Sequence, residues 1–225
     1  MLFRSDRVII AMGRDKNLAY TLFRPFNWIG PGLDSIHTAK EGSSRVVTQF
    51  LGHLLREEPI TLVDGGRQRR SFTHIDDGID ALMRILRNEN GCADGQIFNI
   101  GHPGNNHSIR ELAETMVRVL GEFPGFEKIA RNARIVELSA DEYYGKQYQD
   151  IVHRVPSIKR AEKQLGWKPT IGFEDAVRRT IGHYVEQGAL TERAKDLGNG
   201  PAELIPASRA VAPRSPSAPA PALKG

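Results

Sequence analysis

Strand-like and helix-like segments alternate along the first 190 residues, and this alternation restricts the possible folds more than any other feature. Short apolar runs predict strands at 20–26, 60–63, 71–75, 96–101 and 133–138. Apolar residues at helical spacing predict helices at 46–55, 79–86, 109–120 and 173–185. The strand at 20–26 is expected to be buried and to stop at Pro25. Such alternation is typical of an α/β protein with a mainly parallel sheet.

Three signals mark the ends of these elements. Asp-Gly-Gly at 64–66 predicts a turn after the second strand. Ser108 and Glu111 have the spacing of a capping box, which predicts a helix start. A short helix is expected to begin at Ser157 and to end at Gly166.

Composition excludes several classes of protein. The excess of Lys and Arg over Asp and Glu is 31 − 27 = +4, which is too small to argue for nucleic-acid binding. No apolar run is long enough to span a membrane, and the single cysteine, Cys92, excludes an intrachain disulfide. We see no signal peptide and expect a cytoplasmic protein. From Gly200 onward the chain is rich in Pro and Ala, so we expect a disordered tail there.

The most charged short segment follows the strand at 60–63. Its two glycines let the backbone approach a ligand, and Arg67, Arg69 and Arg70 supply forked donors that match phosphate oxygens. A ligand with a diphosphate group is one interpretation. A solvated basic turn is an equally good one from the spacing alone.

Two other segments contain candidate binding residues. Asn27 follows the strand at 20–26, at the end where open α/β sheets bind ligands, although an asparagine that caps a turn is the simpler local reading. Tyr148 and Arg154 lie in or beside a long loop with three tyrosines, where ordinary loop packing is equally compatible. His102 and His107 lack the spacing of metal ligands, so we expect no metal site and place them at the surface.

Several motifs together resemble the carboxyl-terminal half of extended short-chain dehydrogenases that act on nucleotide sugars, the NAD-dependent epimerase/dehydratase family. They lie at 21–31, 62–77, 98–101 and 165–169. More narrowly, Arg-Pro-Phe-Asn-Trp at 24–28, Tyr-Tyr-Gly-Lys at 143–146 and His-Arg-Val-Pro-Ser at 153–157 resemble the UDP-glucuronate decarboxylase domains of bacterial polymyxin-resistance (aminoarabinose) enzymes. The resemblance implies the carboxyl-terminal part of a Rossmann-type parallel sheet with a small substrate-binding domain.

The resemblance also implies an activity. Such enzymes use bound NAD to oxidise the C4 hydroxyl of UDP-glucuronate, release CO2 and reprotonate the carbon, which gives a UDP-4-keto-pentose for lipid A modification. Arg154 falls on the position of the proposed acid, and its charge could instead stabilise the enolate. The UDP-sugar is expected to bind a set of residues that the matching motifs supply: Asn27, Arg45, Thr61, Leu62, Val63, Asp64, Gly65, Gly66, Arg67, Gln68, Arg69, Arg70 and Tyr148.

The chain also departs from the family pattern. It contains no glycine-rich dinucleotide motif, and the lysine of the family's Tyr-x-x-x-Lys pair would align at about Leu2. We therefore expect residues 1–35, with strands near 71–101, to be a remnant of the NAD-binding domain. Residues 36–190 are expected to be the UDP-sugar-binding region, and 191–225 the tail. Alone, the chain is expected to be inactive.

Three other functions stay open: a UDP-sugar 4-epimerase or 4,6-dehydratase, a UDP-apiose/UDP-xylose synthase, and a nucleotide-sugar-binding module without catalysis. The expected partner is a UDP-sugar rather than nucleic acid or membrane, and a homo-oligomer is allowed for. The strand at 20–26 is expected to expose an edge, which favours association with a chain that carries the other half of the fold.

Overall fold

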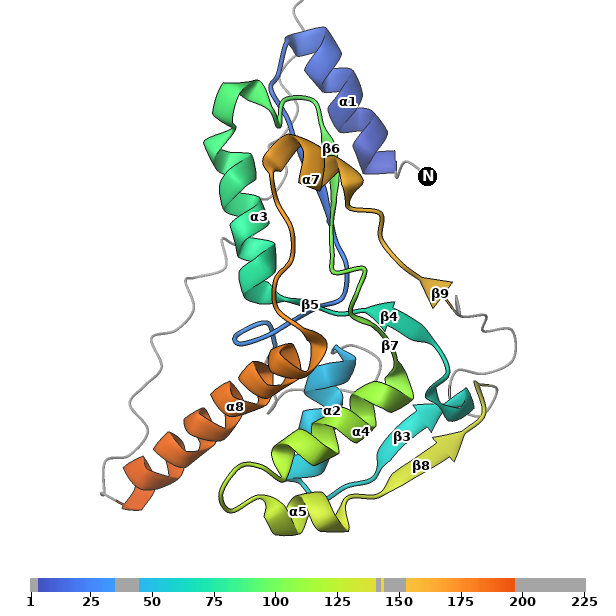
Figure 1. Ribbon diagram of the computed structural model, residues 1–225, viewed down its shortest axis with the longest axis vertical. Coiled ribbons are helices and arrows are strands. Elements are labelled where there is room, and N and C mark those ends of the chain that lie inside the picture. Colours follow the sequence, from blue (N-terminus) through green and yellow to red (C-terminus); the bar gives the residue numbers. More distant parts are fainter. Residues whose placement is uncertain (1–3, 35–44, 141–142, 144–152, 197–225) are drawn as a thin grey trace, which may run out of the picture. The chain divides into compact units, whose positions relative to one another are not determined.

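The computed structural model describes residues 4–34, 45–140, 143 and 153–196 (Figure 1). For residue 4 and residues 189–196 of this set, it describes the backbone alone. The chain divides into two units, residues 1–186 and 187–225, and the cores and the cavity described below lie in the first. No helix in the described ranges is long and apolar enough to cross a membrane. The same residues contain no cluster of three His, Cys, Asp or Glu side chains that could hold a metal ion.

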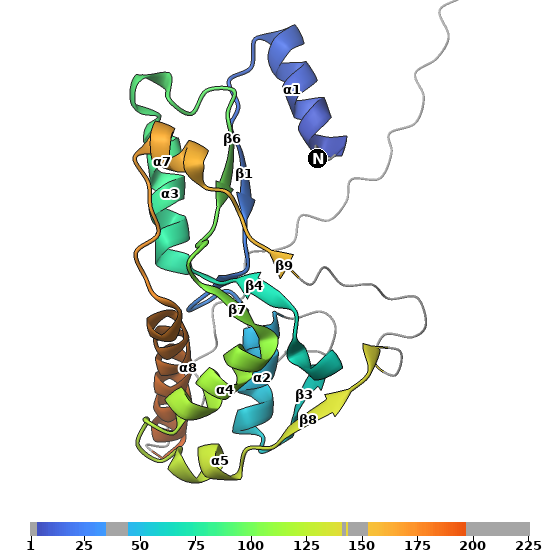
Figure 2. The ribbon, with the colours of Figure 1, turned by 45° about the vertical axis from the view of Figure 1, so that its right-hand side comes forward.

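The first of two apolar cores surrounds a parallel strand pair. The elements in and around it are α1 (Arg4–Lys16), β1 (Leu22–Pro25), β2 (Trp28–Ile29), β5 (Thr73–His74), α3 (Ile75–Arg87), the 3₁₀ turn Glu89–Gly91, β6 (Ile97–Ile100) and α7 (Lys159–Leu165). β1 pairs with β6 and β2 pairs with β5, both parallel, and Figures 1 and 2 show β1 and β6 side by side. Phe98, Ile100 and Trp167 are fully buried in this core, together with Ala81 of α3.

The second core is larger. Its elements are α2 (Val46–Leu55), β3 (Ile60–Val63), the 3₁₀ turn Asp64–Gly66, β4 (Arg69–Ser71), β7 (Asn106–Ser108), α4 (Ile109–Leu120), α5 (Glu127–Asn132), β8 (Ile135–Leu138), β9 (His153–Arg154) and α8 (Phe173–Asp196). β3 pairs with β8 in parallel, while β4 lies between antiparallel β7 and parallel β9. The apolar faces of α2, α4 and α8 meet in the core through Leu51, Leu112 and Ile181.

Local signals explain several element boundaries. Ser108 and Glu111 form the expected capping box: the Ser108 hydroxyl accepts from the Glu111 N–H at 3.0 Å, and the Glu111 carboxylate accepts from the Ser108 N–H at 2.6 Å. These hydrogen bonds lower the pKa of Glu111 below its ordinary value. Gly166 ends α7 in the left-handed region, with φ of 59°. The predicted α/β alternation is confirmed.

Some expectations need correction. β1 is not fully buried, because its side chains alternate and Phe23 is 43% exposed. The strand expected at 71–75 is divided between the end of β4 and β5, and α3 begins at Ile75 because the His74 side chain caps it by accepting from the Asp76 N–H. The short helix α7 begins at Lys159 rather than Ser157. Residues 197–225 of the expected tail lie outside the described residues.

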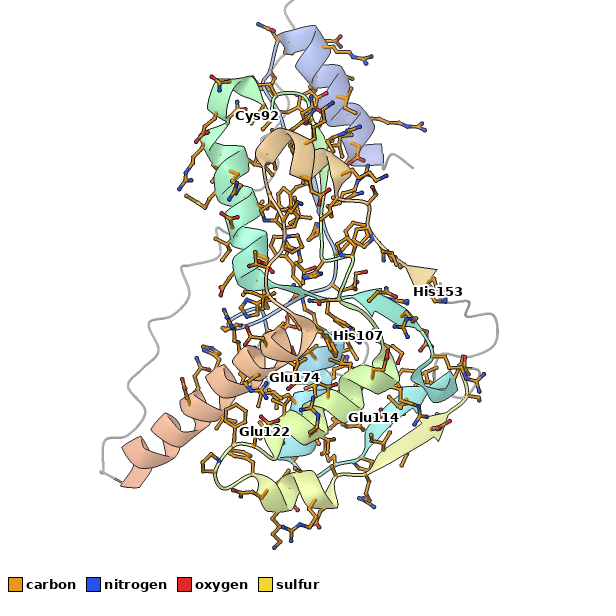
Figure 3. The ribbon with its side chains drawn as sticks, in the orientation of Figure 1. Cys92, His107, Glu114, Glu122, His153 and Glu174 are labelled. Atoms are coloured by element: carbon orange, nitrogen blue, oxygen red, sulfur yellow. The ribbon has the colours of Figure 1, made fainter. Side chains whose placement is uncertain are left out.

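The two histidines expected at the surface are partly buried instead. His107 of β7, which Figure 3 labels, stacks on Phe173, with ring centroids 3.9 Å apart. The His102 Nδ1 accepts a hydrogen bond from the Asn105 N–H at 3.2 Å. Burial lowers the pKa of both imidazoles. Sequence spacing missed this for His107 because the tertiary fold brings Phe173 to its ring.

Asp77 connects the two cores. Its side chain is buried in the first turn of α3, and its carboxylate accepts from the Thr170 N–H at 2.9 Å, the Thr170 hydroxyl at 3.0 Å and the Ile171 N–H at 3.1 Å. The Asp77 carbonyl also accepts from the Trp167 indole at 3.0 Å. One carboxylate therefore holds the segment that leads from α7 to α8.

Candidate functional site

A cavity of about 670 Å³ lies where β1, β3 and β4 end beside the start of α2. Its walls combine apolar side chains with a few polar ones, which is the composition of a small-molecule site. The lining residues are Pro25, Asn27, Trp28, Ile29, Arg45, Val46, Val47, Gln49, Phe50, Thr61, Val63, Gln68, Arg70, Phe72, Ile109 and Tyr143. Six of the thirteen residues expected to bind substrate thus meet at one cavity.

Alternation along β3 decides which residues face the cavity. Thr61 and Val63 line it, whereas Leu62 is 0% exposed in the second core. Leu62 therefore offers a ligand no side-chain contact. The Gln68 side chain bends back over the turn and donates to the Val63 carbonyl at 3.3 Å. This contact holds the Gln68 amide at the cavity wall.

The turn between β3 and β4 depends on its glycines. Gly66 has φ of 66°, and a Cβ there would lie 2.9 Å from the Arg110 backbone nitrogen. Gly65 has φ of 69°, and its carbonyl accepts from Arg110 Nε at 3.0 Å. The Asp64 carboxylate accepts from the Ala140 N–H at 2.8 Å. Asp64, Gly65 and Gly66 therefore shape the turn, and none of the three lines the cavity.

The three arginines of this segment have different positions. Arg70 lines the cavity. Arg69 points away from it and donates to the Asn106 side chain at 3.1 Å, the Asn106 carbonyl at 2.5 Å and Glu111 at 3.1 Å. Arg67 is exposed and lies outside the cavity. The arginine run is therefore neither wholly a phosphate site nor wholly a solvated turn.

Asn27 lies between β1 and β2 in the left-handed region, with φ of 41°. Its carbonyl accepts from the Thr73 N–H at 3.2 Å, and its side-chain amide donates to the Ser71 carbonyl at 3.5 Å. These contacts fix Asn27 at the cavity wall. Asparagine adopts this backbone conformation more readily than most residues. Asn27 therefore both forms the turn and lines the cavity.

Arg45 is held at the cavity by Asp34. Its guanidinium lies 2.6 Å from one Asp34 oxygen, and the other oxygen accepts from the Arg45 N–H at 3.2 Å and the Thr48 hydroxyl at 3.1 Å. The Asp34 carbonyl accepts from the Tyr184 hydroxyl at 2.6 Å, and burial raises the pKa of Tyr184. Asp34 thus orients the start of α2 and partly neutralises Arg45.

Arg154 lies on β9, beside the cavity rather than in its lining. In the parallel β4–β9 pair it is the register partner of Arg70, and its guanidinium lies 5.5 Å from the centroid of the Phe26 ring. His153, labelled in Figure 3, marks the start of the same short strand. Arg154 is exposed, so two cationic side chains occupy neighbouring strands at this edge of the site.

Tyr148 lies outside the described residues. Sequence reasoning did not assign the cavity wall that α2 supplies, including Gln49 and Phe50. The signal for Gln49 is its position one helical turn after Arg45, which places both on one side of α2. Tyr143 also lines the cavity, although the sequence had placed it only in a tyrosine-rich loop.

Comparisons with known proteins agree with this arrangement. Residues 3–101 match the model of the NAD-dependent epimerase/dehydratase family. The PbgP3 protein from Burkholderia pseudomallei is 51% identical in sequence, with a TM-score of 0.70, over 82% of this chain and 51% of that one. The chain therefore spans about half the length of this relative.

Two more distant structures share the fold. UDP-glucuronic acid 4-epimerase from Bacillus cereus, in complex with UDP-glucuronic acid and NAD, has a TM-score of 0.63 at 18% identity, over 81% of this chain and 51% of that one. An NAD complex of dTDP-glucose 4,6-dehydratase from Bacillus anthracis has a TM-score of 0.63 at 17% identity, over 82% of this chain and 50% of that one. NAD is the cofactor of this family. Over residues 3–101 the chain is thus similar to the NAD-dependent epimerase/dehydratase family.

Proposed function

We propose that this chain forms the nucleotide-sugar-binding part of an NAD-dependent enzyme that decarboxylates UDP-glucuronate. The observation that carries the proposal is the cavity beside the Arg70–Arg154 pair, which brings apolar walls, side-chain amides and two cationic side chains together. A nucleotide sugar that carries both a diphosphate and a carboxylate matches this combination. The identity to PbgP3 supports the same reading of the site.

The cavity residues suit the parts of such a ligand. Asn27, Gln49 and Gln68 present side-chain amides, which both donate to and accept from a sugar or a uracil ring. Arg70 supplies a fixed positive charge and a planar fork for a phosphate or carboxylate. Trp28, Phe50 and Phe72 supply the apolar walls that exclude water around it.

Arg154 fits an electrostatic role in decarboxylation. Once C4 is a ketone, the C5–C6 bond breaks, its electron pair moves into the carbonyl to form an enolate, and CO2 leaves; a proton then adds at C5. Arginine keeps its charge in proteins and is a poor proton donor. Beside Arg70, Arg154 would hold the carboxylate before the step and stabilise the enolate after it.

NAD supplies the oxidation of C4 when it is bound, but the described residues do not form its cradle by themselves. A dinucleotide pyrophosphate requires a glycine-rich turn at a helix N-terminus. The two described helices that directly follow a strand have N-termini filled by the chain's own groups: Asp76 and Asp77 stand in the first turn of α3, while Ser108 and Glu111 cap α4.

Epimerisation at C4 is the second candidate, because the Bacillus cereus neighbour is a 4-epimerase bound to UDP-glucuronic acid. An epimerase returns hydride to C4 and keeps the carboxylate, so it has no enolate to stabilise. In a longer PbgP3-like protein, an Arg154→Ala change that lowers CO2 release far more than it weakens UDP-glucuronate binding would favour decarboxylation. Equal losses would assign Arg154 to binding alone.

Calorimetry with the 225-residue chain tests the binding part of this proposal. UDP-glucuronate should bind, and Arg70→Gln should weaken it by about tenfold or more, because a charged hydrogen bond contributes roughly 1.5–3 kcal/mol. Arg154→Gln should weaken UDP-glucuronate more than UDP, because UDP has no sugar carboxylate. Arg67→Gln is the matched control, since Arg67 is exposed outside the cavity, and it should change affinity by less than about twofold. Absence of binding, or equal effects at positions 67 and 70, would contradict the proposal.

A further inference from the structure

The segment that follows β9 is attached to β6. Figures 1 and 2 show the chain running from β9 to α7, which lies beside β6. Pro156 in this segment is buried, and the Asn99 side-chain amide of β6 donates to the Ser157 carbonyl at 3.1 Å. Arg154 therefore stands three residues before a point where the backbone is held by a strand of the first core.

Gly101, the first residue after β6, allows this close approach. It is buried, and a Cβ there would lie 2.7 Å from Pro156 Cγ and 2.9 Å from Phe26 Cβ. Neither atom is the end of a flexible side chain, because one belongs to a proline ring and the other is bonded to the backbone. Gly101 lies outside the left-handed region, so glycine is required here by space rather than by φ. A larger residue would displace Pro156 or Phe26.

A buried hydroxyl holds the backbone of Arg154. Ser71 is 0% exposed, and its hydroxyl donates to the Arg154 carbonyl at 3.4 Å. The same hydroxyl accepts from the Asn106 side-chain amide at 3.3 Å. Arg69 fixes the orientation of that amide, because the Arg69 Nε donates to Asn106 Oδ1 at 3.1 Å. A chain of hydrogen bonds therefore runs from β4 and β7 to β9.

Phe26 determines where the charge of Arg154 lies. The Arg154 guanidinium lies 5.5 Å from the centroid of the Phe26 ring, where a cation is attracted to the aromatic face. The Phe26 N–H donates to the Ile100 carbonyl at 3.0 Å, which fixes this residue to the end of β6. Phe26 also lies between Pro25 and Asn27, which both line the cavity. The charge is thus held against a fixed ring at the edge of the cavity.

We propose that Ser71, Asn99 and Gly101 are positioning residues for Arg154, and that they make the cavity selective for a nucleotide sugar that carries a carboxylate. We call these three residues the supporting residues. The inference rests on the proposed function, since it takes Arg154 to bind the carboxylate of the sugar.

Support is needed because β9 alone holds Arg154 weakly. β9 has two residues, and among the described residues it pairs only with β4. An arginine side chain has many rotamers, and ordering one of them when a ligand binds lowers the affinity. Contacts that order the guanidinium before the ligand arrives remove this cost. None of the supporting residues lines the cavity, so each of them acts through Arg154.

Calorimetry with two ligands tests the selectivity. UDP-glucuronate carries a carboxylate where UDP-glucose carries a hydroxymethyl group, so the ratio of their affinities measures the contribution of Arg154. Gly101→Ala should lower this ratio by about fivefold, while UDP-glucose affinity changes by less than about twofold. Asn99→Ala removes one hydrogen bond and should lower the ratio by about two- to threefold. This second variant decides the matter if Gly101→Ala does not fold.

A matched glycine and a double variant provide the controls. Gly172→Ala should leave the ratio unchanged, because a Cβ at Gly172 would meet no atom within 4 Å. In an Arg154→Gln background, Gly101→Ala should lower the ratio no further, because the charge that it displaces is gone. A loss of equal size with and without Arg154, or equal losses of affinity for the two ligands, would overturn the proposal.

Nuclear magnetic resonance separates this proposal from the proposed function. The Arg154 Nε–H resonance is assigned by its absence in Arg154→Gln, and its ring-current shift is measured against Phe26→Leu. Gly101→Ala should decrease this shift without any ligand, because the guanidinium leaves the ring. An unchanged shift in folded Gly101→Ala would refute the positioning of Arg154 alone. A decreased shift, in a chain that does not prefer UDP-glucuronate to UDP-glucose before substitution, would refute the proposed function while the positioning stands.

Discussion

The two cores of this chain differ in how completely they are covered. In the cavity region, α2, α4 and α8 bury Leu51, Leu112 and Ile181 among one another. Around β1, the sheet has two strands among the described residues, and α1 and α3 carry five exposed apolar side chains, Val8, Met12, Ile79, Met83 and Leu86. The comparison teaches that the cavity can be built on local helix packing, whereas a parallel sheet depends on neighbours on both sides.

Truncation of one leucine in each core is the sharpest test of this difference. Leu51→Ala leaves a cavity among α2, α4 and α8, so it should lower the free energy of unfolding by about 3 kcal/mol. Leu86→Ala removes exposed atoms and should change it by less than about 0.5 kcal/mol. Urea unfolding followed by circular dichroism measures both variants. Similar losses at the two positions would show that α3 is covered in solution.

Asp77 connects the two cores, so its substitution tests how much that connection contributes to stability. Asp77→Asn replaces one accepting oxygen by an NH2 group that faces donors from Thr170 and Ile171, so unfolding should become easier by about 2 kcal/mol. Asp80→Asn is the control, because Asp80 pairs with Arg84 at the surface, at 3.0 Å, and should change stability by less than about 0.5 kcal/mol. An unaltered urea midpoint for Asp77→Asn would mean that the α7–α8 segment is held by other contacts.

The smallest expected effect is a dependence on pH that arises from buried histidines. Burial lowers the pKa of His74 and His102, and in each the Nδ1 accepts a backbone N–H, which requires the neutral ring. The unfolded chain therefore binds more protons below its ordinary histidine pKa of about 6.5, and stability should fall as the pH drops from about 7.5 to about 5.5. The urea midpoint across this range measures it.

A histidine variant provides the comparison for that measurement. His102→Asn removes one titrating group and should flatten the profile; an unchanged slope would assign the effect to other groups. The Glu111 carboxyl does not interfere, because its pKa is lowered. Its contribution is complete above the ordinary carboxyl pKa of about 4.3 and is lost only as the pH falls below that range, through the lowered value.

Much of the secondary structure could be predicted from the sequence. Hydrophobic spacing placed α2, α4 and α8, and the Ser108–Glu111 pair placed the start of α4, because these signals act over a few residues. Boundaries were less accurate where an uncommon cap sets them, as at α3, where the side chain of His74 caps the helix start. The sequence could not predict that the apolar face of α3 is exposed, since an exposed apolar stripe and a buried one have the same spacing.

The sequence by itself determined an α/β chain, a glycine turn followed by arginines, and the motifs of a nucleotide-sugar family. Only the tertiary structure decided which arginine faces the cavity: alternation and the Asn106 and Glu111 acceptors turn Arg69 away and leave Arg70 at the wall. It also placed Arg154 beside Arg70, because β9 joins β4 from a distant part of the sequence. Local patterns specify elements, whereas the position of a charge depends on which strands pair.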